Sequence, residues 1–273
     1  MGGLRRRALG RTGLMVTELG LGAMNIPDVE EGGATLLRAL ELGINFVDTA
    51  RVYRGSEFLV GTVLEEWQGE GVIVASKTTA RSRDGVLADV ERSLRHLRRD
   101  RVDLYQLHDV FAEDWERVMG PGGALEGLQE AQGQGLVGHI GLTSHTPQVL
   151  ERAVRCGQFA TVMLKVNPFE REPRYIVALA HEAGLGVIAM KPFGGLGMPA
   201  TLKGLDSALD PPTMLHYCLS DPHLSVVIPG ARFPGEVEEL VDLALSYEPM
   251  TPQELARCDE EADRVSAQMA GPE

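Results

Sequence analysis

The sequence is poor in cysteine and in aromatic residues, and both shortages narrow the class of protein. Its three cysteines, Cys156, Cys218 and Cys258, stand far apart and form no CxxC pair, so neither a disulfide framework nor a structural zinc site is indicated. Aromatic residues make up 5% of the chain, and the core must therefore be built from aliphatic side chains. We expect a reducing, cytoplasmic setting.

Long apolar runs and excess positive charge are also absent. No window approaches about 18 uninterrupted apolar residues, so no membrane span is expected. The 26 basic residues against 39 acidic ones give a formal net charge of −13, which argues against a general affinity for nucleic acid or anionic membranes. Three consecutive arginines, Arg5, Arg6 and Arg7, are expected to be a solvated end. The histidines outside the strand ends form no HxH or HxxxH pair, so no metal is expected.

Two signals alternate along the 273 residues. Short runs rich in β-branched residues predict strands at Glu18–Met24, Ile44–Asp48, Val72–Lys77, Val102–His108, Val137–Leu142, Val162–Val166, Gly186–Met190 and Ser225–Ile228. Amphipathic stretches between them predict helices at Gly33–Leu42, Ser56–Gln68, Asp84–Leu97, Ala124–Gln134, Pro147–Arg155, Arg174–Ala183, Pro212–Ser220 and Glu236–Ser246. Eight strands alternating with eight helices predict an α/β fold, a closed (β/α)8 TIM barrel formed by one domain of residues 1–273.

Segments outside this alternation complete the predicted fold. Leu4–Val16 is expected to form a β-hairpin before the first strand, and Pro252–Gln268 an extra C-terminal helix. Lys191–Pro212, rich in glycine and proline, is expected to be irregular rather than helical. An open doubly wound sheet is the alternative, but residues 20–25 (GLGAMN) lack the third glycine of a dinucleotide-binding fingerprint, and a Walker loop is absent.

Polar side chains mark the carboxyl ends of three consecutive predicted strands. Asp48 ends the second strand, Lys77 the third and His108 the fourth, and Tyr53 lies in the loop after the second. In such a barrel the carboxyl ends form the functional end, so these four side chains are expected to converge. An ammonium group beside a phenol stabilises the phenolate, a carboxylate holds the ammonium, and an imidazole can polarise a carbonyl group. The pattern indicates a site for reducing C=O.

The segment Phe46–Glu57 (FVDTARVYRGSE) resembles the signature of the aldo-keto reductase family around its catalytic Asp and Tyr. Lys77 and His108 match the strand ends where that family keeps its catalytic Lys and His, and the resemblance runs across essentially the whole chain. It implies a barrel oxidoreductase that reduces aldehydes and ketones with NADPH, reversibly and without a metal. Asp48, Tyr53, Lys77 and His108 would be its catalytic residues, with Tyr53 as the proton donor.

The resemblance also implies that NADP(H) lies extended across the second half of the barrel mouth. Ser144 and His145, in place of the family's usual Ser-Asn, would bind the nicotinamide carboxamide. Met163 stands where the family commonly has a Gln for the same group, and Met190 where many members stack a Tyr on the nicotinamide ring. The loop after the seventh strand adds three further positions, Lys191, Pro192 and Gly194.

The loop after the eighth strand is where the family binds the adenosine 2′-phosphate. The backbone of Gly230 and the guanidinium of Arg232 suit phosphate oxygens. Glu236 takes a position that is often Gln, and Leu240 one that is often Asn at the adenine edge, so a preference for NADPH over NADH is less secure here. Glu239 is also assigned to this site.

Two other functions remain open from the residues alone. Lys165, within the sixth predicted strand, is placed where a barrel aldolase forms its imine, which makes a Schiff-base lyase one alternative. A barrel that binds the nucleotide without catalysis is the other. The expected partner is a small-molecule carbonyl substrate, and no heptad or repeat marks a subunit interface.

Overall fold

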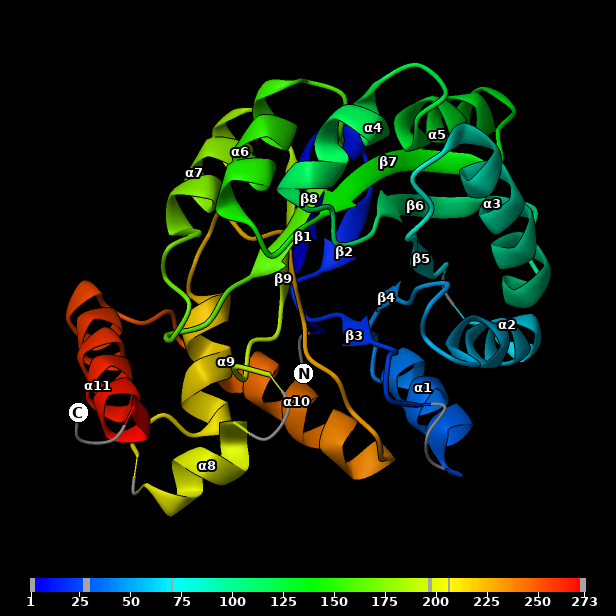
Figure 1. The fold of residues 1–273 in the computed structure, drawn as a ribbon. Coiled ribbons are helices and arrows are strands. Elements are labelled where there is room, and N and C mark those ends of the chain that lie inside the picture. The colour runs from blue at the N-terminus through cyan, green and yellow to red at the C-terminus, as the bar shows by residue number, and fades with distance from the viewer. Residues whose placement is uncertain (1–2, 27–29, 70, 196–197, 206, 271–273) are drawn as a thin grey trace.

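The computed structural model describes residues 3–26, 30–69, 71–195, 198–205 and 207–270 (Figure 1). Its centre is a sheet of eight parallel strands in which each strand pairs with the next along the chain. These strands are β3 (Leu21–Gly22), β4 (Phe46–Asp48), β5 (Ile73–Thr78), β6 (Val102–Leu107), β7 (Val137–Thr143), β8 (Thr161–Lys165), β9 (Gly186–Met190) and β10 (Val226–Ile228).

The barrel closes between its first and last strands through isolated bridges. Leu19 pairs with Val227 and Gly22 with Gly230, both in parallel orientation. The backbone N–H of Gly22 donates to the carbonyl oxygen of Pro229 at 2.8 Å. A Cβ atom at Gly22 would lie 3.2 Å from that oxygen, so glycine permits this close approach. The predicted TIM barrel is confirmed.

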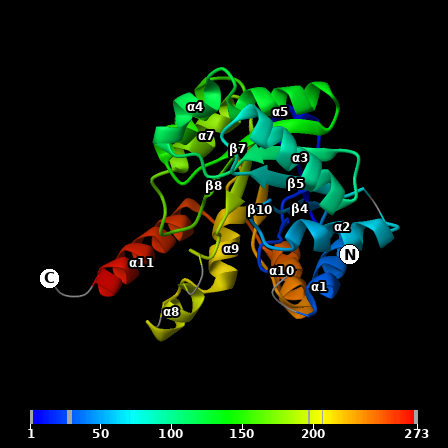
Figure 2. The same cartoon turned by 45° about the vertical axis from the view of Figure 1, so that its right-hand side comes forward.

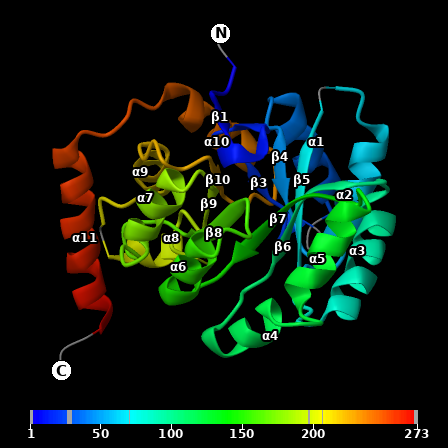
Figure 3. The ribbon, with the colours of Figure 1, turned by 90° about the horizontal axis from the view of Figure 1, so that it is seen from above.

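Helices cover the outer face of the strands, as Figures 1 and 3 show from two directions. The structure describes α1 (Gly32–Glu41), α2 (Ser56–Glu66), α3 (Arg83–Leu97), α4 (Trp115–Met119), α5 (Ala124–Gly133), α6 (Pro147–Arg155), α7 (Arg174–Glu182), α8 (Met198–Gly204), α9 (Pro211–Leu219), α10 (Pro234–Ser246) and α11 (Pro252–Ala270). Two short 3-10 turns, η1 (Gly10–Thr12) and η3 (Ala112–Asp114), lie between strands.

The predicted hairpin and the extra helix are both present. Strands β1 (Arg6–Ala8) and β2 (Met15–Thr17) form an antiparallel pair. Helix α11 stands at the edge of the molecule (Figure 2), where Asp259 pairs with Arg174 of α7 and accepts a hydrogen bond from Tyr217 of α9. The C-terminal helix is thus attached to the barrel through polar contacts with two of its helices and through its buried apolar side chains, which belong to the hydrophobic core.

Most predicted boundaries lie within two residues of the observed ones, and the exceptions have local causes. The first predicted strand, Glu18–Met24, is reduced to Leu21–Gly22, since its first part pairs with the last strand only through the isolated bridge between Leu19 and Val227. The prediction that Lys191–Pro212 is irregular was wrong for Met198–Gly204, which form α8. Its proline lies in the first turn and its glycine at the last position, so both residues mark helix ends.

The barrel has an inner and an outer apolar layer. The inner cluster contains Phe46, Leu104 and Met163 from the strands, together with Leu9 and Val16 from the hairpin region. The outer cluster joins the helices to the outward side chains of the strands. Side chains of the hairpin region therefore pack into the amino-terminal end of the barrel.

The expectation that Arg5, Arg6 and Arg7 form a solvated end was wrong for Arg7. Its guanidinium pairs with Glu18 at 2.9 Å and also donates to the carbonyl oxygens of Leu219 and Leu224. The Glu18 side chain is fully buried. Partners more than 200 residues away along the chain explain why the local run of arginines gave no sign of this contact.

Two glycines of the hairpin allow the cost of a positive φ to be measured apart from the cost of a close contact. Gly10 (φ +53°) would place a Cβ 2.2 Å from the Gly186 nitrogen, whereas Gly13 (φ +77°) has nothing within 4 Å. We expect Gly13→Ala to cost roughly 1–2 kcal/mol of unfolding free energy, and Gly10→Ala roughly 1–3 kcal/mol beyond that. Urea unfolding of both variants tests this. Equal losses would show that the contact with β9 contributes nothing.

Candidate active site

Side-chain alternation along three adjacent strands points polar groups into one end of the barrel. Asp48 ends β4, Lys77 is the penultimate residue of β5, and Gln106 is the penultimate residue of β6. Successive side chains of a strand point to opposite faces, so residues two apart share a face. The residues two positions earlier belong to the inner apolar cluster: Phe46, Ala75 and Leu104. The polar groups therefore form the next layer above that cluster.

Lys77 and Asp48 form a buried ion pair. The Lys77 Nζ lies 2.5 Å from Asp48 Oδ1, and the two side chains are 1% and 4% exposed. Lys77 also donates to the carbonyl oxygen of Thr49 at 2.8 Å, and Gln106 Nε2 donates to Asp48 Oδ2 at 3.3 Å. Burial alone would lower the pKa of Lys77, but the Asp48 carboxylate and Tyr53 together raise it above its ordinary value. Lys77 is thus an ammonium ion at neutral pH.

Tyr53 brings a phenol to this ion pair from the loop between β4 and α2. The Lys77 Nζ lies 4.8 Å from the centre of the Tyr53 ring. Burial raises the pKa of Tyr53, and the charge of Lys77 opposes that rise without cancelling it. The phenol is therefore protonated at neutral pH and can donate its proton, while Lys77 supplies the charge that would stabilise the phenolate.

His108 faces Tyr53 across the same space. The two rings meet edge to face, with their centroids 5.7 Å apart. Burial, together with the charges of Lys77 and Arg81, lowers the pKa of His108 to about 3. Its Nδ1 atom is buried and has no hydrogen-bond partner among the described residues. The neutral imidazole can thus donate one hydrogen bond without carrying a charge. All four predicted catalytic side chains are brought together.

A second buried network lies behind these side chains and was not predicted. The Glu57 carboxylate accepts hydrogen bonds from Ser76 and Ser93, each at 2.6 Å, and pairs with Arg51. Ser76 precedes Lys77, and the Arg51 N–H donates to the Lys77 carbonyl oxygen at 2.9 Å. The network therefore ties the loop of Tyr53 to β5 through α2. The sequence places Glu57 inside a helix but gives no sign of its distant partners.

Ser144, His145 and Lys191 are gathered at the ends of β7 and β9. Ser144 Oγ donates to the carbonyl oxygen of Val110 at 2.7 Å, and the His145 Nε2 lies 3.4 Å from the Lys191 Nζ. Burial and the charge of Lys191 lower the pKa of His145, so its imidazole is neutral at neutral pH. Lys191 has a φ of +54°, a conformation in which Asn167 Nδ2 donates to its carbonyl oxygen at 3.1 Å.

The two methionines assigned to the nucleotide have different surroundings. Met163 is 1% exposed and belongs to the inner cluster, whereas Met190 is partly buried and packs against that cluster. Pro192 is buried in the loop that follows. Gly194 has a φ of +73°, and a Cβ there would lie 2.9 Å from Met198 Cγ, so the loop turns closely past the start of α8.

The loop after β10 holds the remaining predicted positions. The Arg232 N–H donates to Glu236 Oε2 at 2.7 Å, and the Arg232 guanidinium lies 5.3 Å from the centre of the Phe233 ring. Gly230 and Glu239 are exposed. Leu240 is 8% exposed and packs in the outer core, so its side chain serves the packing of α10. Glu236 thus bonds the backbone of the loop that carries Arg232.

Lys165 has an environment unlike that of an imine-forming lysine. It is the last residue of β8, and its ammonium pairs with Glu170, whose carboxylate also accepts a hydrogen bond from Asn167 at 2.8 Å. The Lys165 side chain is 25% exposed. Imine formation needs a desolvated neutral amine, so this paired and partly solvated ammonium ion does not favour the lyase alternative.

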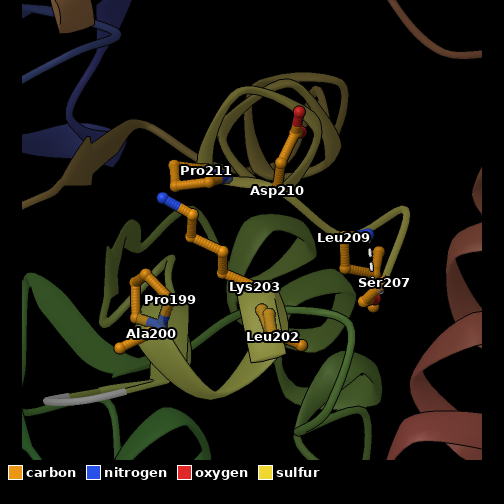
Figure 4. Close-up of a pocket in the computed structure, with 8 residues that line it drawn as sticks. All are labelled: Pro199, Ala200, Leu202, Lys203, Ser207, Leu209, Asp210 and Pro211. Carbon is orange, nitrogen blue, oxygen red and sulfur yellow. Dashed lines mark hydrogen bonds between the residues drawn. The ribbon is translucent and has the colours of Figure 1, made fainter. Parts of the chain in front are cut away.

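A hollow of about 510 Å³ lies between α8 and the start of α9 (Figure 4). Pro199, Leu202 and Lys203 line it from α8, and Asp210 and Pro211 from the start of α9. None of the four predicted catalytic residues lines it. The candidate site is therefore defined by the convergent side chains at the strand ends.

No group of three or more His, Cys, Asp or Glu side chains in the described part of the chain could hold a metal ion. Within the same residues, no helix is both long and apolar enough to cross a membrane.

The chain is similar to a known protein family over most of its length. The model of the aldo/keto reductase family matches residues 18–213. The oxidoreductase YqkF of Bacillus subtilis is 31% identical over 221 residues, which are 75% of this chain and 69% of YqkF. L-galactose dehydrogenase of Arabidopsis thaliana is 32% identical over 154 residues, 50% of this chain and 47% of that protein.

A solved structure shows the same fold over nearly the whole chain. Aldo-keto reductase AKR11C1 from Bacillus halodurans, in its holo form, matches with a TM-score of 0.79 and 26% identity, and the match covers 96% of both chains. The barrel is thus that of an oxidoreductase. The chain belongs to the aldo-keto reductase family.

The low pKa of His108 has a consequence for stability. The pKa of His108 is 6.5 in the unfolded chain and about 3 in the folded protein, so between these values the unfolded state binds a proton that the folded state does not. Stability is therefore lost as the pH falls through this window. Between pH 6.5 and pH 4 we expect the unfolding free energy of the wild type to fall more steeply than that of His108→Gln. The difference in slope should be up to about 1.4 kcal/mol per pH unit. Urea unfolding at several pH values tests this. Parallel curves for the two proteins would contradict it.

Proposed function

We propose that this protein reduces aldehydes and ketones to alcohols with NADPH, and that it catalyses the reverse oxidation as well. The observation that carries the proposal is the buried Lys77–Asp48 ion pair beside a protonated phenol, Tyr53, which faces the neutral imidazole of His108. A proton donor, a charge that stabilises its conjugate base and a neutral hydrogen-bond donor together suit a carbonyl oxygen that gains a proton.

The residues at the other strand ends fit a nicotinamide nucleotide, which supplies the hydride when bound. Ser144 and His145 would hold the carboxamide, and the half-buried Met190 would cover the ring. The cations Lys191 and Arg232 and the exposed backbone of Gly230 suit phosphate oxygens. Met163 would add an apolar floor, since it is buried in the inner cluster.

Two residues of the loop after β10 would act on the 2′-phosphate of NADPH in opposite directions. The guanidinium of Arg232 suits a dianionic phosphate, whereas the Glu236 carboxylate would repel it. That carboxylate is engaged by the Arg232 N–H, so its role in holding the loop is compatible with a nearby phosphate. These contacts support NADP(H) as the cofactor, with a preference weaker than a Gln at this position would give.

The chain's own groups account for the proton in the reaction. Tyr53 donates its phenolic proton to the carbonyl oxygen, and Lys77 stabilises the phenolate that remains. Asp48 keeps Lys77 charged and fixes its orientation through the 2.5 Å contact. His108 donates a hydrogen bond to the same carbonyl oxygen. In the oxidative direction the phenolate accepts the proton of the alcohol.

Replacing the proposed proton donor tests the mechanism. We expect Tyr53→Phe to keep its affinity for NADPH and to lose roughly 10²–10⁴-fold in the rate of aldehyde reduction, since a positioned acid contributes about that much. Tyr175→Phe, which removes an exposed hydroxyl on α7, is the matched control. A Tyr53→Phe enzyme with a kcat near that of the wild type would show that another group supplies the proton.

The cofactor assignment makes a separate prediction. We expect Arg232→Ala to weaken NADPH binding by roughly 1.5–3 kcal/mol, the range of a hydrogen bond to a charged group, and to leave NADH binding nearly unchanged. Arg257→Ala removes the same charge from an exposed position on α11 and serves as the control. Fluorescence titration with both nucleotides gives the two affinities. Equal losses for NADPH and NADH would mean that Arg232 does not read the 2′-phosphate.

A further inference from the structure

Asp109 follows His108 at the end of β6, and the mechanism above gives it no role. Its backbone has a φ of +48°, a left-handed conformation that is uncommon for residues other than glycine. Such a conformation costs free energy, and it persists only where the surrounding contacts fix it. Strain of this kind gathers at functional sites, so an observed case calls for an explanation.

The backbone of Asp109 is fixed from both sides. Its N–H donates to Thr143 Oγ1 at 2.8 Å. Arg81 Nη2 donates to the carbonyl oxygens of His108 and Asp109, at 3.0 Å and 2.8 Å. These bonds join the end of β6 to the end of β7 and to the loop after β5. The direction in which the Asp109 side chain leaves the backbone is therefore set by the fold.

The carboxylate of Asp109 is not neutralised by the cation beside it. Arg81 forms its ion pair with Asp114, at 2.9 Å. Asp109 Oδ1 is buried and accepts no hydrogen bond from the described residues. Buried carboxylate oxygens are ordinarily paired, because a desolvated acceptor without a donor is unfavourable. A fixed backbone thus presents an acceptor whose partner is not among the described side chains.

The charge of Asp109 acts on both sides of the candidate site. It raises the pKa of Tyr53, and it opposes the lowering of the pKa of His145. Tyr53 is the proposed proton donor, and His145 is proposed to hold the nicotinamide carboxamide. Asp109 also directly follows His108, and its N–H donates to Thr143, which directly precedes Ser144 and His145, so the residue stands between the two halves of the candidate site.

We propose that the Asp109 carboxylate is a specificity-determining group that accepts a hydrogen bond from a hydroxyl of the substrate next to the carbonyl being reduced. This inference rests on the proposed function and names its substrate class as hydroxylated aldehydes. A carboxylate or phosphate on the substrate would be repelled by Asp109. An ammonium group would be attracted by Asp109 but also repelled by Lys77 and Arg81, whose charges both lower the pKa of His108 at this end of the barrel. A neutral hydroxyl meets neither penalty.

The test compares two three-carbon aldehydes, glyceraldehyde and propanal, which differ in their hydroxyl groups. The measured quantity is the ratio of their kcat/KM values with NADPH, for the wild type, Asp109→Asn and Asp109→Ala. Asparagine tolerates the left-handed conformation, so Asp109→Asn preserves the backbone and changes the charge. Glu113→Gln removes an exposed charge from the same loop and is the matched control.

We expect the ratio to fall roughly tenfold in Asp109→Asn and roughly 10- to 100-fold in Asp109→Ala, as loss of a hydrogen bond to a charged group predicts. The ratio should be unchanged in Glu113→Gln. If both aldehydes change by the same factor in the Asp109 variants, or if Glu113→Gln gives the same shift, the inference is overturned while the proposed function stands. If the wild type reduces neither aldehyde, the proposed function fails first.

Discussion

The buried ion pair between Lys77 and Asp48 is the interaction on which the rest of the site depends. Removing two charges from water costs several kcal/mol for each ion, and the loss is recovered only where close pairing and further hydrogen bonds satisfy both groups. Here Thr49 and Gln106 complete the pair. Because Lys77 and Gln106 come from neighbouring strands, and Asp48 from a third, the ion pair requires the strand register of the barrel.

This constraint extends outward through the sheet. The residues that flank Lys77 point toward the helices, where Ser76 donates to Glu57 and Thr78 to Asp89. Alternation along β5 therefore divides one short strand into a face that carries the ammonium group and a face that anchors α2 and α3. The position of Tyr53 is coupled to the same helices, because Arg51 in its loop pairs with Glu57. Packing outside the barrel thus fixes the geometry of the groups inside it.

Local patterns in the sequence carried the prediction of the fold and of the four convergent side chains, because both follow from periodicity and from residues at strand ends. Local patterns could not predict contacts between residues that lie far apart along the chain. Arg7 reads as one of three surface arginines, yet it meets Glu18 and the carbonyl oxygens of Leu219 and Leu224. Gln106 shares the facing set of His108 by period two, so alternation could have revealed it. No local pattern announces the backbone strain at Asp109.

The hairpin of β1 and β2 gives the barrel a direction. Leu9 and Val16 belong to the inner cluster, so the amino-terminal end of the barrel is filled by side chains from the first part of the chain. Among the described residues the two ends of the barrel therefore differ, because side chains fill the amino-terminal end and the polar groups of the candidate site lie at the carboxyl ends of the strands. If cofactor and substrate both enter and leave at that end, the last of them to dissociate determines when the next can bind. The order of release can then limit the rate of turnover as much as the chemical step does.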